Sequence, residues 1–406
     1  MKPINMKKYV VFLLLMAGLG MVFGDSLAQT LPKNLLIYYG YPSLINGAAG
    51  DLTAASNTFM QYQYVVLGEG LEQSGHGDHI KTKTIIANIK SNVKVFGYIW
   101  LGRHIAGRTP WTNAEIRTHV DLWKAMGVQG IFLDDYGYAQ NVTRARQDSA
   151  VRYIHAQGLN AFVNTGEIEE VFGSTINQVY NPIGMGSPVD YRDFYLWESY
   201  VVINGRFYGK YLIFSEWEFW RVKSENLRAY QNSLAFKTMS ITTPDFNGTF
   251  NANQWNFTWY TAWLQGHEAT GGGEGNYSAS APSANLAPFR ARPTIANPGT
   301  QFLTAVQSTE NQFFRLTDTG KIWADTTSKT AGFIPPVVCQ STASGLWNSA
   351  AIWSCGHVPY PYDDVLIKTP HIIAVTPALG KVQCRKLEIQ RGAVFNGMGV
   401  FEVVNR

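Results

Sequence analysis

Short apolar runs separated by amphipathic stretches dominate the chain up to about residue 285. Each run is rich in β-branched and aromatic residues and has the length of a strand buried in a parallel sheet. We expect eight strands, at residues 35–41, 63–68, 94–100, 130–135, 159–164, 194–202, 236–242 and 267–271.

The stretches between these runs have helical periodicity and recognisable ends. Thr112 precedes an amphipathic stretch that stops at Gly127, which predicts a helix over 113–126. A second helix is predicted over 142–157, where Gly158 would end it. Eight strands that alternate with helices over roughly 250 residues are typical of a (β/α)8 TIM barrel. The alternative is a doubly wound open sheet, but no glycine-rich phosphate loop follows the first strand.

The pattern changes after the eighth strand. Ser, Ala, Pro and Asn fill residues 278–298, which indicates a linker or a wrapping crossover, and 301–325 reads as a small β hairpin or meander. Short β runs then recur at ten-residue spacing, as in the parallel-β or sandwich modules that follow catalytic domains in secreted bacterial proteins. A β repeat without a complete cap would fit this tail. The expected organisation is therefore a signal peptide at 1–28, the barrel at 30–285, a linker with a small hairpin or meander at 286–345, and a small all-β module at 346–406.

The first 28 residues have the pattern of an export signal. Lys7 and Lys8 precede an apolar run, and small residues up to Ala28 offer a cleavage site. No later apolar run is long enough for a span, so no stable membrane segment is expected after cleavage. We expect a secreted protein, extracellular or at the cell surface, with the periplasm as a further compartment. The C-terminal β region would provide any attachment to the surface.

Composition and charge exclude several classes of protein. The chain is 46% hydrophobic and 15% charged, which excludes a disordered chain. Net charge is +4 without a basic cluster beyond Lys7 and Lys8, so nucleic acid is not an expected partner. Aromatic residues make up 14%, which suits a large core and also a surface that stacks sugar rings.

The odd number of cysteines allows one disulfide at most among Cys339, Cys355 and Cys384.

Acidic residues follow the fourth predicted strand and lie within the sixth. Asp134 and Asp135 follow a buried run, and Glu198 interrupts an apolar one. Chemistry in a barrel takes place at the carboxyl ends of the strands. Two carboxylates that converge there suit glycoside cleavage, in which one protonates the leaving oxygen and the other attacks the sugar or activates water. An apolar, aromatic lining would separate their pKa values.

Alternation along a strand sends Asp134 and Asp135 to opposite sides, so only one can face the barrel axis. The structural alternatives are a helix cap or an ion pair. For the two aspartates the candidate partners are Arg144 and Arg146. For Glu198 they are Arg192 and Arg206.

The order of motifs along the barrel resembles a known family. The motifs are YYGYP, GYIW, GVQGIFLDDY, LNAFVNTG and DFYLWESY. Together they resemble the spherulin-4-type glycoside hydrolases and the related endo-α-1,4-polygalactosaminidases, over residues 34–275. The resemblance implies metal-free, retaining hydrolysis of polymers of α-linked galactosamine or N-acetylgalactosamine. It places Asp134 at the first catalytic acid, Asp135 at its neighbour and Glu198 at the strand-6 carboxylate.

Two departures from the family pattern leave the substrate open. An Asn-Pro…Gly-Pro-Gly stretch usually follows the second strand, where this chain has GEGLE at 68–72. Position 135 is Asp rather than Glu.

Further residues are candidates for contact with the substrate. Tyr38 and Tyr98 end the first and third strands and are expected to donate hydrogen bonds to the catalytic carboxylates, with core packing as the alternative. The other candidates are Trp100, Asn164, Glu167, Trp217 and Trp220. His76, Asp78 and His79 are interpreted as polar residues of a flexible loop, and neither a metal nor another cofactor is expected.

The sequence thus predicts a secreted glycoside hydrolase with a polysaccharide substrate. Asp134 would be the nucleophile or its electrostatic equivalent, Glu198 the general acid/base, and Asp135 a supporting residue. One alternative is a non-catalytic carbohydrate-binding or adhesion protein on a barrel scaffold. The other is an α-glycosidase that acts on another glycan.

Overall fold

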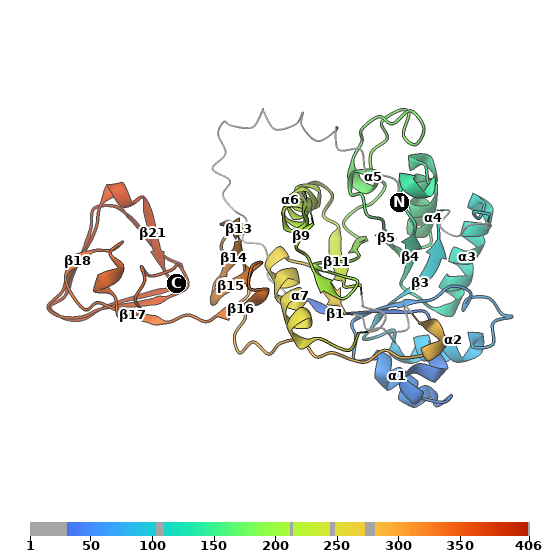
Figure 1. The fold of residues 1–406 in the computed structure, drawn as a ribbon, viewed down its shortest axis with the longest axis horizontal. Coiled ribbons are helices and arrows are strands. Elements are labelled where there is room, and N and C mark those ends of the chain that lie inside the picture. Colours follow the sequence, from blue (N-terminus) through green and yellow to red (C-terminus); the bar gives the residue numbers. More distant parts are fainter. Residues whose placement is uncertain are drawn as a thin grey trace.

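A closed eight-stranded parallel barrel forms the larger part of the molecule (Figure 1). The computed structural model describes residues 31–102, 109–211, 214–243, 248–272, 281–309 and 311–404, so the expected signal peptide lies outside the described residues. The predicted barrel is confirmed, and the open sheet is excluded because β1 pairs with both β2 and β12. In their order around the barrel the strands are β1 (Lys33–Tyr38), β12 (Ala269–Gly271), β11 (Lys237–Ile241), β6 (Phe194–Trp197), β5 (Asn160–Asn164), β4 (Gly130–Asp134), β3 (Lys94–Trp100) and β2 (Tyr64–Leu67).

The sixth strand is shorter than the sequence predicts. It ends at Trp197, so Glu198 lies just beyond the strand rather than within it. Ser199 and Val201 have φ angles of 56° and 50°, a left-handed backbone that interrupts an extended strand. The chain then forms two small antiparallel hairpins before the next helix, from β7 (Val202–Ile203), β8 (Arg206–Phe207), β9 (Lys210–Tyr211) and β10 (Phe214–Ser215).

Helices surround the barrel, and the best predicted one is confirmed. Helix α3 spans Asn113–Met126, with Thr112 and Glu115 in a reciprocal capping box and Gly127 at φ 95° as its C-cap. The second predicted helix is also present, two residues shorter at its start. The remaining bounds are α1 (Leu52–Phe59), α2 (His79–Ile89), α4 (Arg144–Ala156), α5 (Glu169–Phe172), α6 (Glu216–Leu234) and α7 (Ala252–Gln265).

Aromatic rings fill the barrel interior. Phe96 of β3 contacts Phe194 of β6 with ring centroids 5.4 Å apart, and these two strands are not neighbours in the sheet. On the outer side, Gly97 leaves room for Trp123 of α3, since a Cβ atom there would lie 2.1 Å from the indole. Alternation then turns Tyr98 inward, above the aromatic layer. The polar residues at the carboxyl ends of the strands lie above this aromatic layer.

The amino-terminal end of the barrel is closed by polar contacts. Glu268 accepts hydrogen bonds from Lys33 at 2.7 Å and from Tyr64 at 2.5 Å. Burial alone would raise the pKa of Glu268, but these two donors and the nearby Lys237 lower it. This end of a barrel serves stability.

After β12 the chain wraps down the outside of the barrel to a small antiparallel sheet. Ala287 accepts from Tyr62, and Trp255 of α7 donates to Ala291 at 2.8 Å, so this segment covers the barrel where an eighth helix would lie. The sheet comprises β13 (Gln307–Ser308), β14 (Gln312–Thr317), β15 (Gly320–Asp325) and β16 (Thr330–Ile334). Its inner residues Phe313 and Ile322 share the hydrophobic core of the barrel.

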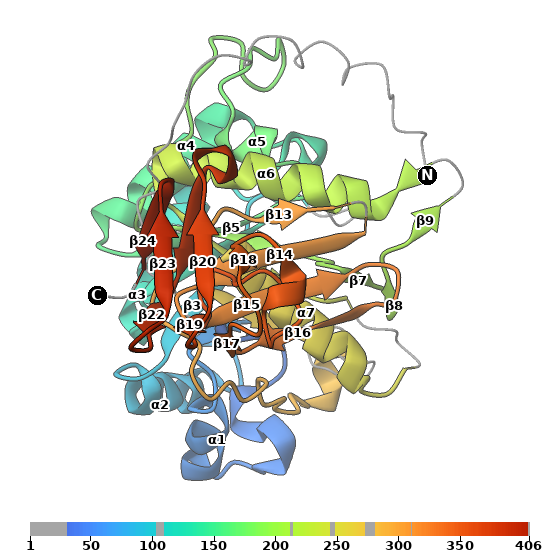
Figure 2. The same cartoon turned by 90° about the vertical axis from the view of Figure 1, so that its left-hand side faces the viewer.

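The last part of the chain is a three-sided coil of parallel strands that projects from the barrel (Figures 1 and 2). Its core is separate from that of the barrel. Strands from successive turns stack as β17 (Val338–Gln340), β19 (Asp364–Ile367) and β22 (Lys386–Ile389); as β18 (Gly345–Leu346), β20 (Ile372–Val375) and β23 (Val394–Gly397); and as β21 (Lys381–Cys384) and β24 (Val400–Val403).

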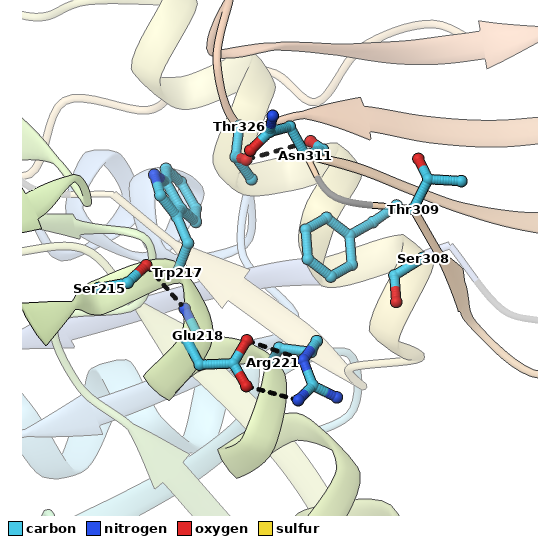
Figure 3. Close-up of a pocket in the computed structure, with 9 residues that line it drawn as sticks. Ser215, Trp217, Glu218, Arg221, Ser308, Thr309, Asn311 and Thr326 are labelled. Atoms are coloured by element: carbon cyan, nitrogen blue, oxygen red, sulfur yellow. Dashed lines mark hydrogen bonds and ion pairs between the residues drawn. The ribbon is translucent and has the colours of Figure 1, made fainter.

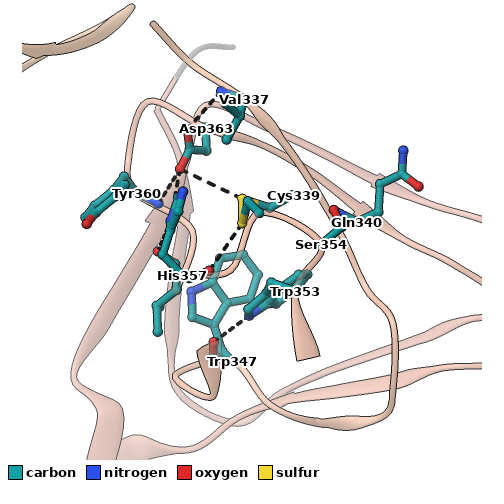
Figure 4. Close-up of a disulfide and its surroundings, with 11 residues drawn as sticks. Val337, Cys339, Gln340, Trp347, Trp353, Ser354, His357, Tyr360 and Asp363 are labelled. Atoms are coloured by element: carbon teal, nitrogen blue, oxygen red, sulfur yellow. Dashed lines mark hydrogen bonds and ion pairs between the residues drawn. A yellow bond between two sulfur atoms is a disulfide. The ribbon is translucent and has the colours of Figure 1, made fainter. Parts of the chain in front are cut away.

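A disulfide joins Cys339 and Cys355 inside this coil (Figure 4). It closes a segment of the first turn that contains β18, with 16 positions between the two cysteines. Trp347 and Trp353 lie beneath it in the core. Cys384 is a buried free thiol.

No helix in the described part of the chain combines the length and the hydropathy needed to cross a bilayer.

Candidate functional site

Asp134 lies at the carboxyl end of β4, where three donors converge on its side chain. Its Oδ2 atom accepts from the Tyr98 hydroxyl at 2.9 Å. Its Oδ1 atom accepts from the Asn164 amide at 2.9 Å and from the backbone N–H of Asp135 at 3.0 Å. Both oxygens of the Asp134 side chain therefore act as acceptors. Burial, and after it the charge of Asp134, raises the pKa of Tyr98, which keeps its hydroxyl a donor.

Asn164 links Asp134 to Glu198. Its Nδ2 atom, at the end of β5, also donates to Oε2 of Glu198 at 3.2 Å. One amide nitrogen therefore contacts carboxylates from two other strands. Asn164 is 9% exposed, whereas Asp134 is half-buried and Glu198 is exposed, so the pair opens to solvent at the mouth of the barrel.

Asp135 turns away from Asp134, as strand alternation predicts. The Trp100 indole donates to its Oδ2 atom at 2.9 Å. Asp135 has φ 52°, the left-handed conformation that lets the chain leave the strand sharply. Gly102 lies against this turn, because a Cβ atom there would meet the Asp135 carbonyl at 2.4 Å. Trp100 is 3% exposed, so it orients Asp135 instead of offering a ring face to solvent.

A buried lysine supports the neighbouring turn. Lys223 of α6 donates to the carbonyl of Gly166 at 2.8 Å and lies 4.7 Å from the ring centre of Trp197, the residue before Glu198. Burial lowers the pKa of Lys223 to about 8, and the charge of Glu167 offsets part of this effect. Glu167 itself is exposed beside this turn. Sequence analysis missed Lys223 because helix periodicity gives no sign that an ammonium group points inward.

The arginines considered as alternative partners have other contacts. Arg192 pairs with Asp190, and Arg206 with Glu216. Arg144 donates to the backbone carbonyls of Val171 and Gly173. Arg146 donates to those of Leu101 and Trp111.

Three of the predicted substrate contacts lie away from the carboxylates, namely Tyr38, Trp217 and Trp220. Tyr38 is fully buried against Phe59 of α1 and donates to the carbonyl of Tyr41 at 3.0 Å. Its neighbour Tyr39 contacts Tyr98 instead, at a ring-centroid distance of 5.4 Å. Alternation along β1 is the signal that could have favoured Tyr39, because Tyr38 faces the helices.

Two of the candidate substrate contacts, Trp217 and Trp220, belong to helix α6. Trp220 is fully buried and packs edge-on against Phe313 of the small sheet, so it has no face open to a ligand. Trp217 is half-buried and lines a different cavity, between α6 and that sheet. The aromatic residues on either side of Glu198, Trp197 and Tyr200, are also buried. Neither of these two rings presents a face to solvent beside Glu198.

The histidines and acids of the 76–79 loop have structural contacts. Asp78 accepts from the backbone N–H and the hydroxyl of Ser43. His79 contacts the carbonyl of Leu71 at 2.9 Å. Elsewhere among the described residues, His155, Asp190 and Asp193 lie close enough to one another to hold a cation. However, the buried Asp193 already accepts from His155 and from the backbone of Ala161, at the amino-terminal end of β5 and β6.

Several solved structures are similar to this chain at low identity. The glycoside hydrolase domain of PelA from Pseudomonas aeruginosa is 12% identical, with 59% of this chain and 95% of that chain covered and a TM-score of 0.34. Alpha-galactosidase I from Mortierella vinacea is 12% identical, with 74% and 83% covered and a TM-score of 0.37. A putative dihydrodipicolinate synthetase from Pseudomonas aeruginosa is 10% identical, with 62% and 72% covered and a TM-score of 0.35. The chain matches no protein-family model and no curated protein. Structural neighbours thus include glycoside hydrolases and also proteins named for other reactions.

Proposed function

We propose that this protein is a glycoside hydrolase that cleaves a polymer of α-linked galactosamine or N-acetylgalactosamine. The observation that carries the proposal is the contact of one amide, that of Asn164, with both Asp134 and Glu198. The choice of amino sugar rests on the resemblance of the strand-end motifs to the polygalactosaminidases.

The spacing of the two acids favours a retaining mechanism. Oδ1 of Asp134 and Oε2 of Glu198 both accept from Nδ2 of Asn164. The distance between these two oxygens therefore cannot exceed the sum of the two hydrogen-bond lengths. That upper limit lies below the roughly 6.5–9.5 Å that separates the carboxyl groups of inverting enzymes, and it accommodates the roughly 5–5.5 Å of retaining enzymes.

In this mechanism Glu198 protonates the glycosidic oxygen as the bond to the leaving sugar breaks. Asp134 attacks the anomeric carbon and forms a glycosyl-enzyme ester, or stabilises the equivalent cation. Glu198, now ionised, removes a proton from water, which attacks the same carbon and releases Asp134. Solvent exposure of Glu198 lets water enter, and the donors from Tyr98 and Asn164 hold the Asp134 carboxylate in place. Asp135, held by Trp100, keeps the β4 turn in position.

We further propose that the protein is exported and acts without a metal, with the C-terminal coil as a possible means of attachment to the cell surface. The export proposal rests on residues 1–28 and the metal independence on the family resemblance.

The experiment is a panel of glycans, with acetylated and deacetylated galactosamine polymers and an α-galactan, assayed for released reducing ends in EDTA. Wild type is expected to cleave a galactosamine polymer, whereas Glu198→Gln is not. Cleavage of the α-galactan alone would establish the α-glycosidase alternative. Binding of a polymer without cleavage of any would establish the adhesion alternative.

A further inference from the structure

A cavity of about 310 Å³ lies between the first turn of α6 and the β13–β16 sheet (Figure 3). This volume is within the roughly 300–1,000 Å³ of small-ligand sites. Its described lining residues are Ser215, Trp217, Glu218, Arg221, Ser308, Thr309, Asn311, Phe313 and Thr326. We call it the α6–sheet pocket.

The lining has the composition of a sugar site. Two members are aromatic, Trp217 and Phe313, and the others carry hydroxyl, amide or charged groups, with no aliphatic side chain among them. A sugar ring presents an apolar face of C–H groups and a rim of hydroxyls. Aromatic rings pack against the apolar face of the sugar, and side chains that donate and accept hydrogen bonds contact its hydroxyls. A purely apolar ligand would cover the exposed Ser308, Thr309 and Asn311 side chains without replacing the hydrogen bonds that they make to water.

The charged part of the lining is held rigidly. Arg221 donates twice to Glu218, with its Nε atom 3.0 Å from Oε2, and its Nη1 atom contacts Glu225 at 2.6 Å. Ser215 caps the helix by accepting from the backbone N–H of Glu218. On the opposite wall Thr309 and Asn311 are exposed and come from the edge of the small sheet.

The pocket is close to the proposed catalytic site. Trp217 contacts Tyr208 at a ring-centroid distance of 5.6 Å, and the Tyr208 hydroxyl donates to the carbonyl of Ser199, the residue after Glu198. A single side chain therefore separates the pocket from the backbone that carries Glu198. A polymer that occupies the catalytic site can reach the pocket only if it extends beyond the sugars being cleaved.

From these observations we infer that the α6–sheet pocket is a second glycan site, which holds a segment of the polysaccharide outside the catalytic site. The identity of the glycan rests on the proposed function, but the existence of the pocket does not. Trp217 would provide the aromatic platform, and Thr309 and Asn311 the hydrogen bonds to sugar hydroxyls.

The test is fluorine NMR of the full chain labelled with 5-fluorotryptophan and carrying Glu198→Gln, which prevents cleavage. Signals of Trp217 and Trp100 are assigned by their loss in Trp217→Phe and Trp100→Phe. The probe is a hexasaccharide of α-1,4-linked galactosamine and N-acetylgalactosamine. Thr309→Ala combined with Asn311→Ala alters the pocket. Gln307→Ala combined with Gln312→Ala alters exposed residues of β13 and β14 that flank Thr309 and Asn311 and do not line the pocket.

The inference predicts a saturable shift of the Trp217 signal. Loss of two hydrogen-bonding side chains should weaken the binding that this signal reports by about tenfold or more in the Thr309/Asn311 variant. The Gln307/Gln312 variant should match the parent. A Trp217 signal that does not move, or that titrates equally in both variants, would overturn the inference. Failure of the proposed function has a separate signature, since the Trp100 signal would stay unchanged and wild type would cleave no glycan.

Discussion

The side-chain amide nitrogen of Asn164 lies 3.2 Å from Oε2 of Glu198. The same nitrogen donates to Asp134 at 2.9 Å, so the distance between the two acids depends on this amide. In the proposed mechanism Asn164 positions both acids, and its loss would let their side chains leave the arrangement that the reaction needs.

Replacement of Asn164 tests this role. Asn164→Ala should lower kcat/KM on the cleaved polymer by about 10²-fold, the usual cost of a positioned polar donor. The control is Asn160→Ala on the same strand, at the opposite end of the barrel, where the side chain accepts from Lys94. Equal activity of the two variants would show that the amide does not position the acids.

The Tyr98 hydroxyl is expected to support catalysis without supporting the fold. Tyr98→Phe removes one hydrogen bond to Asp134 while the ring keeps its contacts with Tyr39 and Phe132. A loss of roughly 1–1.5 kcal/mol in the transition state corresponds to about a tenfold fall in kcat. Tyr64→Phe is the matched control, because its hydroxyl contacts Glu268 at the other end of the barrel. That variant should lose stability and keep its kcat, and the opposite pattern would contradict the account.

Lys223 predicts a pH dependence of activity. Burial lowers the pKa of this lysine to about 8, so the ammonium is charged below that pH and neutral above it. Its charge holds the Gly166 carbonyl and lies over Trp197. We expect the kcat of wild type to fall above about pH 8. Lys223→Met should be slower at neutral pH and lack this alkaline limb, whereas an identical limb in the variant would assign the titration to another group.

His267 predicts a pH dependence of stability. It is buried beside Ser240, and burial together with Arg228 lowers its pKa to about 3. The unfolded chain binds this proton near pH 6.5, so the imidazole contributes stability above that pH, which is lost as the pH falls toward 3. Between pH 6.5 and 5 this loss is roughly 2 kcal/mol. Urea unfolding at both pH values should show the loss in wild type and a correspondingly smaller loss in His267→Gln. Parallel pH curves for the two proteins would refute the assignment.

Much of the barrel could be predicted from sequence because local signals determined it. All eight strands were located, and the ends of α3 follow from Thr112 and Gly127, which cap it. The meeting of Asp134 and Glu198 followed from the rule that parallel strands end on one face of a barrel.

Other features depend on contacts distant in sequence. Trp220 was a candidate for contact with the substrate, yet the small sheet covers it through Phe313, 93 positions further along the chain. The left-handed residues after Trp197 that end β6 are not glycines, so their residue types did not indicate this backbone conformation. The sequence left the C-terminal module open between a parallel-β and a sandwich arrangement. The choice between these two arrangements, and the choice of Cys339 and Cys355 as partners, needed the three-dimensional register.

The rate of glycan cleavage in Asp134→Asn, Glu198→Gln and the double variant tests the central claim most directly. Each single variant should lose about 10³-fold or more in kcat, and the double variant should be little worse than the slower single one, because the two acids act as a unit. Glu388→Gln on the exposed coil serves as the control and should keep full activity. Near wild-type turnover in either single variant, with the fold intact, would contradict the account.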